Sequence, residues 1–272
     1  MTKKENYQKE LNEYLKVYFK TNENREILKY LELNSDLPSR RANIELANAF
    51  ADLTDNYNGI ELENIWTLCQ ALIQLNSNKA PTNNPKEFLP FCGIWAIGAI
   101  GANNQSFYQE SLSILKEFAN DQRWRVREAV AFGLQKLLKK HHSKVLKKLE
   151  NWILQDNWLV MRAVAAGIAH PSVLTNKQVS SKALEIHHKI FLNIINSRDI
   201  TSKNFKILKK GLNYTLSVVI QSSPKDGFAF FERYTSIENK QLQDIIKENL
   251  NKNRLIKNFP KEVKLVRRKL KY

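Results

Sequence analysis

The sequence predicts an all-α protein, and three observations support this fold class. The 272 residues include only 8 glycines and 7 prolines, too few for the many turns of an all-β sandwich. Leu, Ile, Ala, Lys and Glu, several of which favour helices, dominate the long runs between breaks. No segment alternates convincingly over strand length. The nearest, "YTLSVVIQ", lies in a run that reads equally well as a buried helix.

The first 75 residues predict three or four helices. Apolar residues at helical spacing indicate one or two amphipathic helices in the first thirty-odd residues: Leu11, Tyr14, Leu15, Tyr18 and Phe19. A further helix is expected after Pro38, with Asp36 or Ser39 as its cap. Its inward-facing residues would be Ile44, Leu46, Ala47, Phe50 and Leu53. The stretch "ENIWTLCQALIQL" predicts another helix, from about Leu62 to Leu75.

The polar stretch "NSNKAPTNNPKEF", residues 76–88, predicts a loop and a possible joint between subdomains. After it, helices are expected at 88–102, 105–119, 123–140, 143–155, 158–169, 177–196, 202–222, 225–234 and 239–253. We therefore predict an N-terminal helical region at 1–75, a repeat region at 86–253 continuous with it, and a basic tail at 254–272. A frayed terminus is the default expectation for such a tail.

Two stretches repeat each other at a separation of 34 residues. Aligning Trp124 with Trp158 also aligns Val126 with Val160, and it places Gly133 on Gly167. An earlier stretch, "FCGIWAIGAIG", carries a comparable step of small residues. A period of roughly 30 to 47 residues with two helices per unit indicates a helical solenoid. Small residues would let neighbouring inner helices approach closely, and each tryptophan would fill the seam where two helices meet their turn.

The stretch "DQRWRVREAVAFGL", residues 121–134, resembles a HEAT repeat. Two copies are clear, and the good match covers roughly residues 86 to 171. The resemblance implies a HEAT/ARM-like α-α superhelix, a right-handed solenoid of helical hairpins with a concave face. Proteins of this family are mostly binding scaffolds. Asp121 and Asp156 match the turn aspartate of the family, which usually caps the following helix.

A more distant resemblance is to bacterial alkylpurine DNA glycosylases of the AlkD and AlkC type. The stretch "WRVREAVAFGL" is similar to the helix starts of these enzymes. The resemblance implies that Trp124, Arg125 and Arg127 lie near a DNA-binding groove, with Trp158 and Arg162 one repeat further on. The sequence lacks the Trp-Asp-x-x-Asp type of segment that supplies the catalytic carboxylate of those enzymes. We therefore assign no catalytic residue.

The chain is strongly basic, with a formal net charge of +16. Such a charge favours nucleic acid or another polyanion, although lysine also accumulates in proteins from AT-rich genomes. Arginines at a helix start can hold phosphates, and a tryptophan between them can stack on an unpaired base. The alternative is that an arginine such as Arg125 or Arg127 pairs with the turn aspartate of the adjacent repeat. The candidate nucleic-acid-binding residues are Trp124, Arg125, Arg127, Trp158, Arg162, Lys206 and Lys210.

Other basic clusters are weaker candidates. Lys203 and Lys209 complete a stripe with Lys206 and Lys210 on one predicted helix. The lysines from Lys136 to Lys148 are better explained as a solvated convex face, and Arg40 with Arg41 forms a third, weaker candidate.

The remaining residue types predict no metal and no cofactor. The histidines at 141–142 and 187–188 are adjacent pairs, which point about 100° apart on a helix and do not easily share a metal ion. Cys69 and Cys92 lie in apolar runs, as expected for buried free thiols in a reducing compartment. The charged N-terminus resembles no signal peptide, and no run is long enough to span a membrane. We expect a cytoplasmic monomer that does not bind membranes.

These observations favour a non-catalytic helical-repeat binding protein. Its expected partner is nucleic acid, DNA rather than RNA, or else an acidic protein. Two alternatives stay open: a DNA alkylation repair enzyme of the alkylpurine glycosylase type, and a protein–protein interaction scaffold with no role in nucleic-acid binding.

Overall fold

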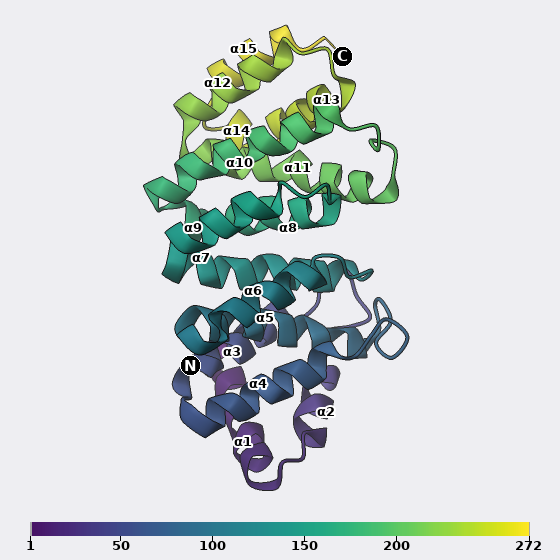
Figure 1. The fold of residues 1–272 in the computed structure, drawn as a ribbon, viewed down its shortest axis with the longest axis vertical. Helices are drawn as coiled ribbons and strands as arrows, with labels where there is room; N and C mark the ends of the chain where they lie inside the picture. The colour runs from purple at the N-terminus through teal and green to yellow at the C-terminus, as the bar shows by residue number, and fades with distance from the viewer. Residues whose placement is uncertain (1, 272) are drawn as a thin grey trace. The chain divides into compact units, whose positions relative to one another are not determined.

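A computed structural model describes residues 2–271, and within that range it consists of helices joined by loops, with no β-strand (Figure 1). The all-α prediction is confirmed. The α-helices are α1 (Lys3–Thr21), α2 (Arg25–Leu33), α3 (Ile44–Leu53), α4 (Gly59–Ile73), α5 (Phe88–Asn103), α6 (Gln105–Phe118), α7 (Trp124–Trp152), α8 (Trp158–Ile168), α9 (Pro171–Leu174), α10 (Lys177–Asn196), α11 (Lys203–Ser222), α12 (Pro224–Thr235), α13 (Lys240–Leu250), α14 (Asn253–Ile256) and α15 (Pro260–Lys269). Short 3-10 helices occupy Thr54–Asn56 and Pro85–Glu87.

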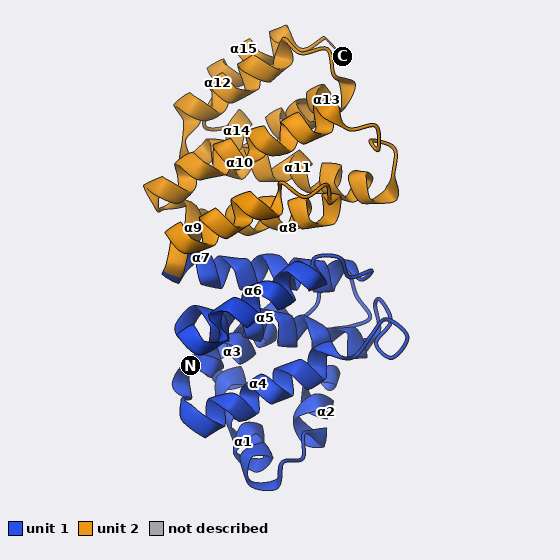
Figure 2. Cartoon of the chain, viewed as in Figure 1, with its two compact units in different colours: residues 1–140 blue, residues 141–272 orange. Residues whose placement is uncertain are grey.

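The chain forms two compact units, residues 1–140 and residues 141–272, shown blue and orange in Figure 2. The boundary falls within α7, where His141 leaves the helical region with φ −129° and ψ 41°. The segment at 76–88, which the sequence marks as a possible joint, lies inside unit 1 instead. Arg123, which directly precedes α7, ties it there by donating hydrogen bonds to the carbonyl oxygen of Ala80 within the segment and to that of Leu75 just before it.

Helix α5 forms the centre of unit 1. Every residue from Phe88 to Ala102 is buried, as expected for a helix that is apolar on all sides. It packs against α3, α4 and α6. A Cβ atom on Gly98 would lie 2.2 Å from the Cα atom of Gly133 in α7. The expectation that small residues allow close helix approach is therefore confirmed at this crossing.

In unit 2, α11 packs between α8 and α13, with α10 and α12 alongside it (Figure 1). His187 of α10 is fully buried and joins α10 to α11. Its Nδ1 lies 2.7 Å from the carbonyl oxygen of Ala183, and its Nε2 lies 3.1 Å from Oγ1 of Thr215. Burial lowers the pKa of His187 to about 4, so this imidazole is neutral at pH 7 and serves as a structural link.

Several expectations about helix starts are wrong. Helix α3 begins at Ile44, and its cap is Asn43, whose Oδ1 accepts from the backbone nitrogen of Leu46 at 3.0 Å. Ile44 is 42% exposed rather than inward-facing. Likewise, α8 is capped by the side chain of Asn157, not by Asp156. In both helices an asparagine directly before the first turn supplies the acceptor, which is the usual chemistry of a helix cap.

The basic C-terminal segment is folded rather than frayed. Helix α15 places Val263 and Val266 in buried positions, and it packs against α12. Pro260 at the first turn of the helix favours this start. The two valines lie three residues apart, which makes one narrow apolar face on an otherwise charged helix. That face explains why the segment docks.

Candidate nucleic-acid interface

The three arginines at and just before the start of α7, Arg123, Arg125 and Arg127, are buried and form contacts within unit 1. Arg123 is 1% exposed and holds Asp121 through two hydrogen bonds, from Nε at 2.9 Å and Nη2 at 2.7 Å. Its Nη1 donates to the carbonyl oxygen of Leu75 at 2.7 Å. Arg123 therefore pairs with the aspartate of its own turn, two residues away, and not with that of an adjacent repeat.

Of the three arginines, Arg125 contacts the residues that are most distant in the sequence. Its Nη1 donates to Oε2 of Glu87 at 2.9 Å, and both side chains are almost fully buried. Its Nη2 donates to the carbonyl oxygen of Ser39 and to Oδ1 of Asn83. A buried guanidinium needs such partners, because an unpaired charge would be costly to remove from water. Arg125 thus fastens two loops to α7.

Arg127 donates to the backbone carbonyl oxygens of Asp121 and Gln122 and is 6% exposed. Because Arg125 and Arg127 are buried and already bonded within unit 1, little of either guanidinium is open to a phosphate backbone. Arg125 and Arg127, both predicted to contact nucleic acid, are therefore not surface residues. No local pattern pairs Arg125 with Glu87, which lies 38 residues away in the sequence.

The two tryptophans aligned by the repeat occupy different environments. Trp158 is 4% exposed, its Nε1 donates to Asp199 at 3.0 Å, and it meets Phe205 edge-on with ring centroids 5.4 Å apart. It fills a seam between α8 and the start of α11, as predicted, and is not a surface contact. Trp124 does not follow this prediction. It is 42% exposed, and only the guanidinium of Arg125 stacks on it, 4.3 Å from the ring centroid.

The predicted lysines of α11 lie on the surface. Lys203, Lys206 and Lys210 are exposed, and their i, i+3, i+7 spacing places them on one face of the helix. None of the three forms an ion pair within the described part of the chain. We call these three residues the α11 stripe. Lys209 instead faces α13 and bonds Asp244 at 2.8 Å.

Arg162 of α8 lies next to α11. Its Cγ atom would be 3.3 Å from a Cβ atom on Gly211, the residue that follows Lys210. The side chain is partly exposed. Of the seven predicted residues, the structure therefore brings Arg162, Lys206 and Lys210 to neighbouring helices of unit 2.

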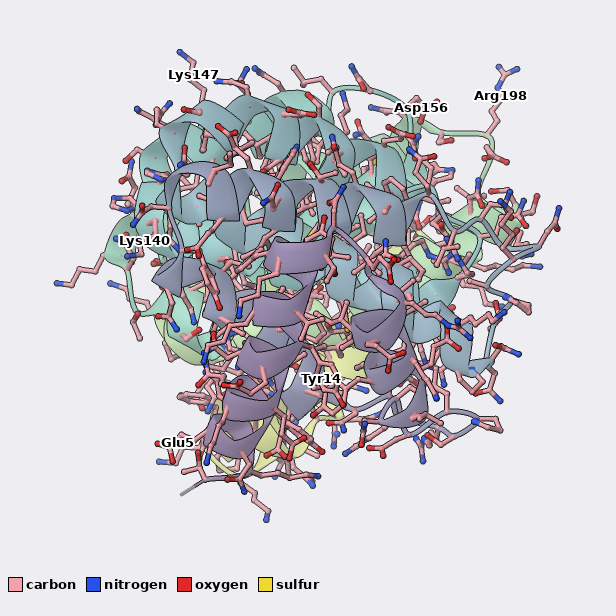
Figure 3. The ribbon with its side chains drawn as sticks, turned by 90° about the horizontal axis from the view of Figure 1, so that it is seen from below. Glu5, Tyr14, Lys140, Lys147, Asp156 and Arg198 are labelled. Atoms are coloured by element: carbon pink, nitrogen blue, oxygen red, sulfur yellow. The ribbon has the colours of Figure 1, made fainter. Side chains whose placement is uncertain are left out.

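The charge is divided very unevenly between the units. Residues 141–272 contain 25 of the 43 lysines and arginines but only 10 of the 27 acidic residues, a net charge of +15. Residues 1–140 contain 18 basic and 17 acidic residues, a net charge of +1. Figure 3 shows Lys147 and Arg198 extending away from the ribbon. A residue count per half of the sequence would have revealed this asymmetry.

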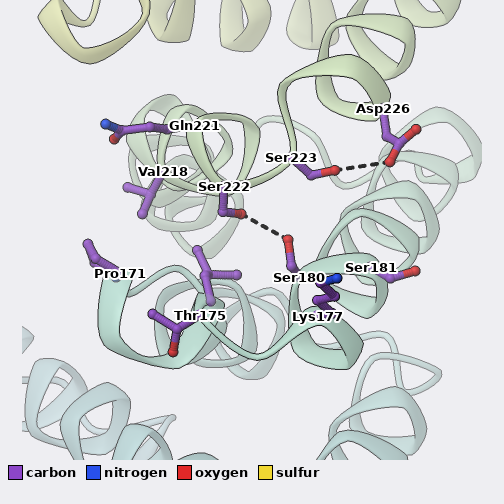
Figure 4. A pocket seen from close by; sticks show the side chains of 11 residues that line it. Pro171, Thr175, Lys177, Ser180, Ser181, Val218, Gln221, Ser222, Ser223 and Asp226 are labelled. Atoms are coloured by element: carbon purple, nitrogen blue, oxygen red, sulfur yellow. Dashed lines mark hydrogen bonds between the residues drawn. The ribbon is translucent and has the colours of Figure 1, made fainter.

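Unit 2 also contains a pocket of about 670 Å³ between the α9–α10 turn and the start of α12 (Figure 4). Buried Leu174 and Val218 contribute its apolar part. Ser180 and Ser222 share a hydrogen bond of 3.0 Å, and Ser223 bonds Asp226 at the same distance. Because one lysine and one aspartate line it together, its charge does not favour an anion.

Other kinds of site are not apparent in residues 2–271. No group of His, Cys, Asp and Glu side chains there could hold a metal ion. Both cysteines are free and buried, and burial raises the pKa of each thiol, so neither is a reactive thiolate at pH 7. Across the same range, no helix combines the length and apolar character needed to cross a membrane.

The paired helices of both units define a helical-repeat protein of the α-α type. Solved structures similar to it include an engineered protein (11% identity, 94% of this chain and 97% of that chain covered, TM-score 0.37). Others are a designed armadillo repeat protein in complex with the peptide (KR)4 (16%, 81% and 98%, 0.29) and a set computationally designed for modular peptide recognition (16%, 81% and 98%, 0.28).

No family model and no curated protein matches the sequence. The similar structures named above are engineered or designed proteins, and they give no support to the resemblance to alkylpurine DNA glycosylases.

Proposed function

We propose that this chain is a helical-repeat binding protein whose second unit binds nucleic acid. The net charge of +15 on residues 141–272 carries the proposal, because a field of that size attracts polyanions. The α11 stripe is the part of this surface that we assign to the interface, with Arg162 beside it. The interface excludes Arg125, Arg127 and Trp158, which are buried.

The chemistry of the α11 stripe favours a phosphate backbone over an acidic protein. Residues 203–210 contain four lysines and no acidic residue, and the exposed positions among them include no aromatic or aliphatic side chain. Protein interfaces usually place apolar or aromatic residues at their centre, whereas phosphate contacts need only regularly placed cations. Lysines on one helix face would displace condensed counterions from DNA, so affinity should fall steeply with salt.

A charge reversal tests the interface. The variant Lys203→Glu/Lys206→Glu/Lys210→Glu and the wild type are titrated with fluorescent single- and double-stranded DNA, and anisotropy is read at about 50 and 200 mM salt. Loss of three phosphate contacts should weaken binding at both concentrations. It should also reduce the slope of log K against log salt by about 2 to 3, since each contact contributes about 0.7 to 0.9.

The chain offers a matched control. Lys144, Lys147 and Lys148 are also exposed in unit 2, and the variant Lys144→Glu/Lys147→Glu/Lys148→Glu changes the net charge equally. We expect this control to lose much less affinity. Equal losses in the two variants would show that net charge alone acts, which contradicts the assigned interface. No binding by the wild type at low salt would contradict the nucleic-acid proposal itself and favour a protein partner.

The proposal places the protein in the cytoplasm, where nucleic acid is accessible and the buried thiols of Cys69 and Cys92 would stay reduced.

A further inference from the structure

A second candidate binding site lies in unit 1, at the start of α7. It is a pocket of about 240 Å³. Its lining combines aromatic, aliphatic and charged side chains: Arg40, Arg41, Ala42, Ile44, Phe91, Trp124, Arg125 and Glu128. The volume is below the roughly 300 to 1,000 Å³ of sites for drug-sized ligands, so the pocket suits one small group.

Trp124 is the exposed exception among the tryptophans of this protein. Its side chain is 42% exposed, whereas the other four are at most 6% exposed: Trp66, Trp95, Trp152 and Trp158. The Arg125 guanidinium covers one face of the indole, 4.3 Å from the ring centroid. Because Arg125 is itself fixed by Glu87, the indole is held in place while much of it remains open. A rigid, exposed aromatic ring of this kind is suited to stacking on a ligand ring.

Two cations stand beside this ring. Arg40 and Arg41 are exposed and form no ion pair within residues 2–271. Their loop is tied to α7 and is held in shape by a hydrogen bond of its own. The carbonyl oxygen of Ser39 accepts from Arg125, and the backbone nitrogen of Arg41 donates to Oγ of Ser39 at 3.1 Å. The same buried arginine therefore supports the aromatic ring and the loop that carries the two free cations.

We propose that this pocket binds a nucleoside phosphate, with the base stacked on Trp124 and the phosphate paired with Arg40 and Arg41. Guanidiniums bind phosphate oxygens through two parallel hydrogen bonds, and an aromatic ring accepts any base. The carboxylate of Glu128 also lines the pocket and opposes a lone anion there, so stacking must contribute to the affinity. The ligand is a free mononucleotide or an unpaired nucleotide of a single strand.

This inference does not rest on the proposed function. The pocket belongs to unit 1, whose net charge is only +1, and it uses no residue of the α11 stripe. Either site can therefore fail in an experiment without the other.

Collisional quenching of tryptophan fluorescence tests the pocket in the full-length chain. Acrylamide reaches exposed indoles, so Trp124 should dominate the quenching, and Trp124→Phe should remove most of it. The probes are adenosine 5′-monophosphate, adenosine, inorganic phosphate and a short single-stranded oligonucleotide. We expect adenosine monophosphate to protect Trp124, and adenosine or phosphate alone to bind about tenfold more weakly or worse. Comparable binding of the mononucleotide and the oligonucleotide would indicate a free nucleotide, and tighter binding of the oligonucleotide would indicate a strand.

Variants then assign the residues by calorimetry. Arg40→Ala/Arg41→Ala should abolish phosphate-dependent affinity, and Trp124→Ala should weaken binding roughly 10- to 100-fold. The matched control is Arg25→Ala/Lys29→Ala, which removes two other exposed cations of unit 1. Equal losses in the control, or phosphate binding as tight as that of the mononucleotide, would overturn the proposal. Displacement of the mononucleotide by an equal concentration of a glutamate-rich peptide would also overturn it in favour of an acidic peptide site.

Discussion

A single guanidinium, that of Arg125, organises much of unit 1. It joins α7 to the loop at Ser39 and to Asn83 and Glu87, segments that lie 86, 42 and 38 residues away in the sequence. The sequence marks Arg125 as special through its place in the repeat. Its partners Ser39, Asn83 and Glu87 cannot be identified from the sequence, because pairing over such separations leaves no local pattern. The repeat pattern alone therefore predicts a ligand contact at Arg125, whereas the contacts that the structure shows are structural ones.

The corresponding prediction concerns stability. Arg125→Met should lower the free energy of unfolding of unit 1 by about 3 to 5 kcal/mol, since it leaves the Glu87 carboxylate buried without its cation. Adding Glu87→Leu should recover part of this loss, because the second change removes the uncompensated charge. Urea denaturation followed by circular dichroism measures both variants, with Arg40→Ala as an exposed control. A double variant less stable than the single variant would contradict the assignment.

At the scale of elements, helices follow directly from local pattern. Predicted helices at 105–119 and 177–196 correspond to α6 and α10 almost residue for residue. Here apolar periodicity and the capping residues Asn104 and Asn176 agree with each other. The different exposure of Trp124 and Trp158 could not be predicted from the repeat. Trp158 is covered by Asp199 and Phe205, which lie far from it in the sequence, and neither of these residues covers Trp124. Local repeats thus predict where helices lie better than what their side chains do.

Alanine substitutions at two helical glycines, Gly98 and Gly211, distinguish the effect of close helix packing on stability from that of helix propensity. A Cβ atom on Gly98 would meet the backbone of Gly133 at 2.2 Å, so Gly98→Ala must push α5 and α7 apart. We expect a loss of about 1 to 3 kcal/mol or more. At Gly211 the nearest atom is Cγ of Arg162, at 3.3 Å on a flexible side chain. Gly211→Ala should therefore be neutral or stabilising by up to about 1 kcal/mol, because alanine favours helix. Thermal unfolding compares the pair, and equal effects would contradict the close packing of α5 on α7.

At the scale of the whole molecule, the two units are alike in being helical but differ in net charge. Both units use the same helical architecture, but unit 2 carries a net charge of +15 and unit 1 carries +1. A lysine-rich genome composition would be expected to enrich both halves of the chain. The proposed polyanionic partner of unit 2 rests on this asymmetry, and in the absence of a partner the clustered positive charges should destabilise unit 2 by repelling one another.

The repulsion predicts that the stability of unit 2, but not that of unit 1, depends on salt concentration. Like charges repel one another within a compact unit, and the screening length falls from about 30 Å at 0.01 M to about 10 Å at 0.1 M ionic strength. Adding sodium chloride over this range should increase amide hydrogen-exchange protection in residues 141–272 and leave residues 1–140 nearly unchanged. Peptide-resolved exchange mass spectrometry reports both units in one sample. An equal increase in protection in both units would show that salt stabilises the whole protein. It would contradict the prediction that charge repulsion destabilises unit 2 in particular. A gain confined to unit 2 that a short DNA duplex reproduces at low salt would connect this repulsion to the surface that we propose to bind nucleic acid.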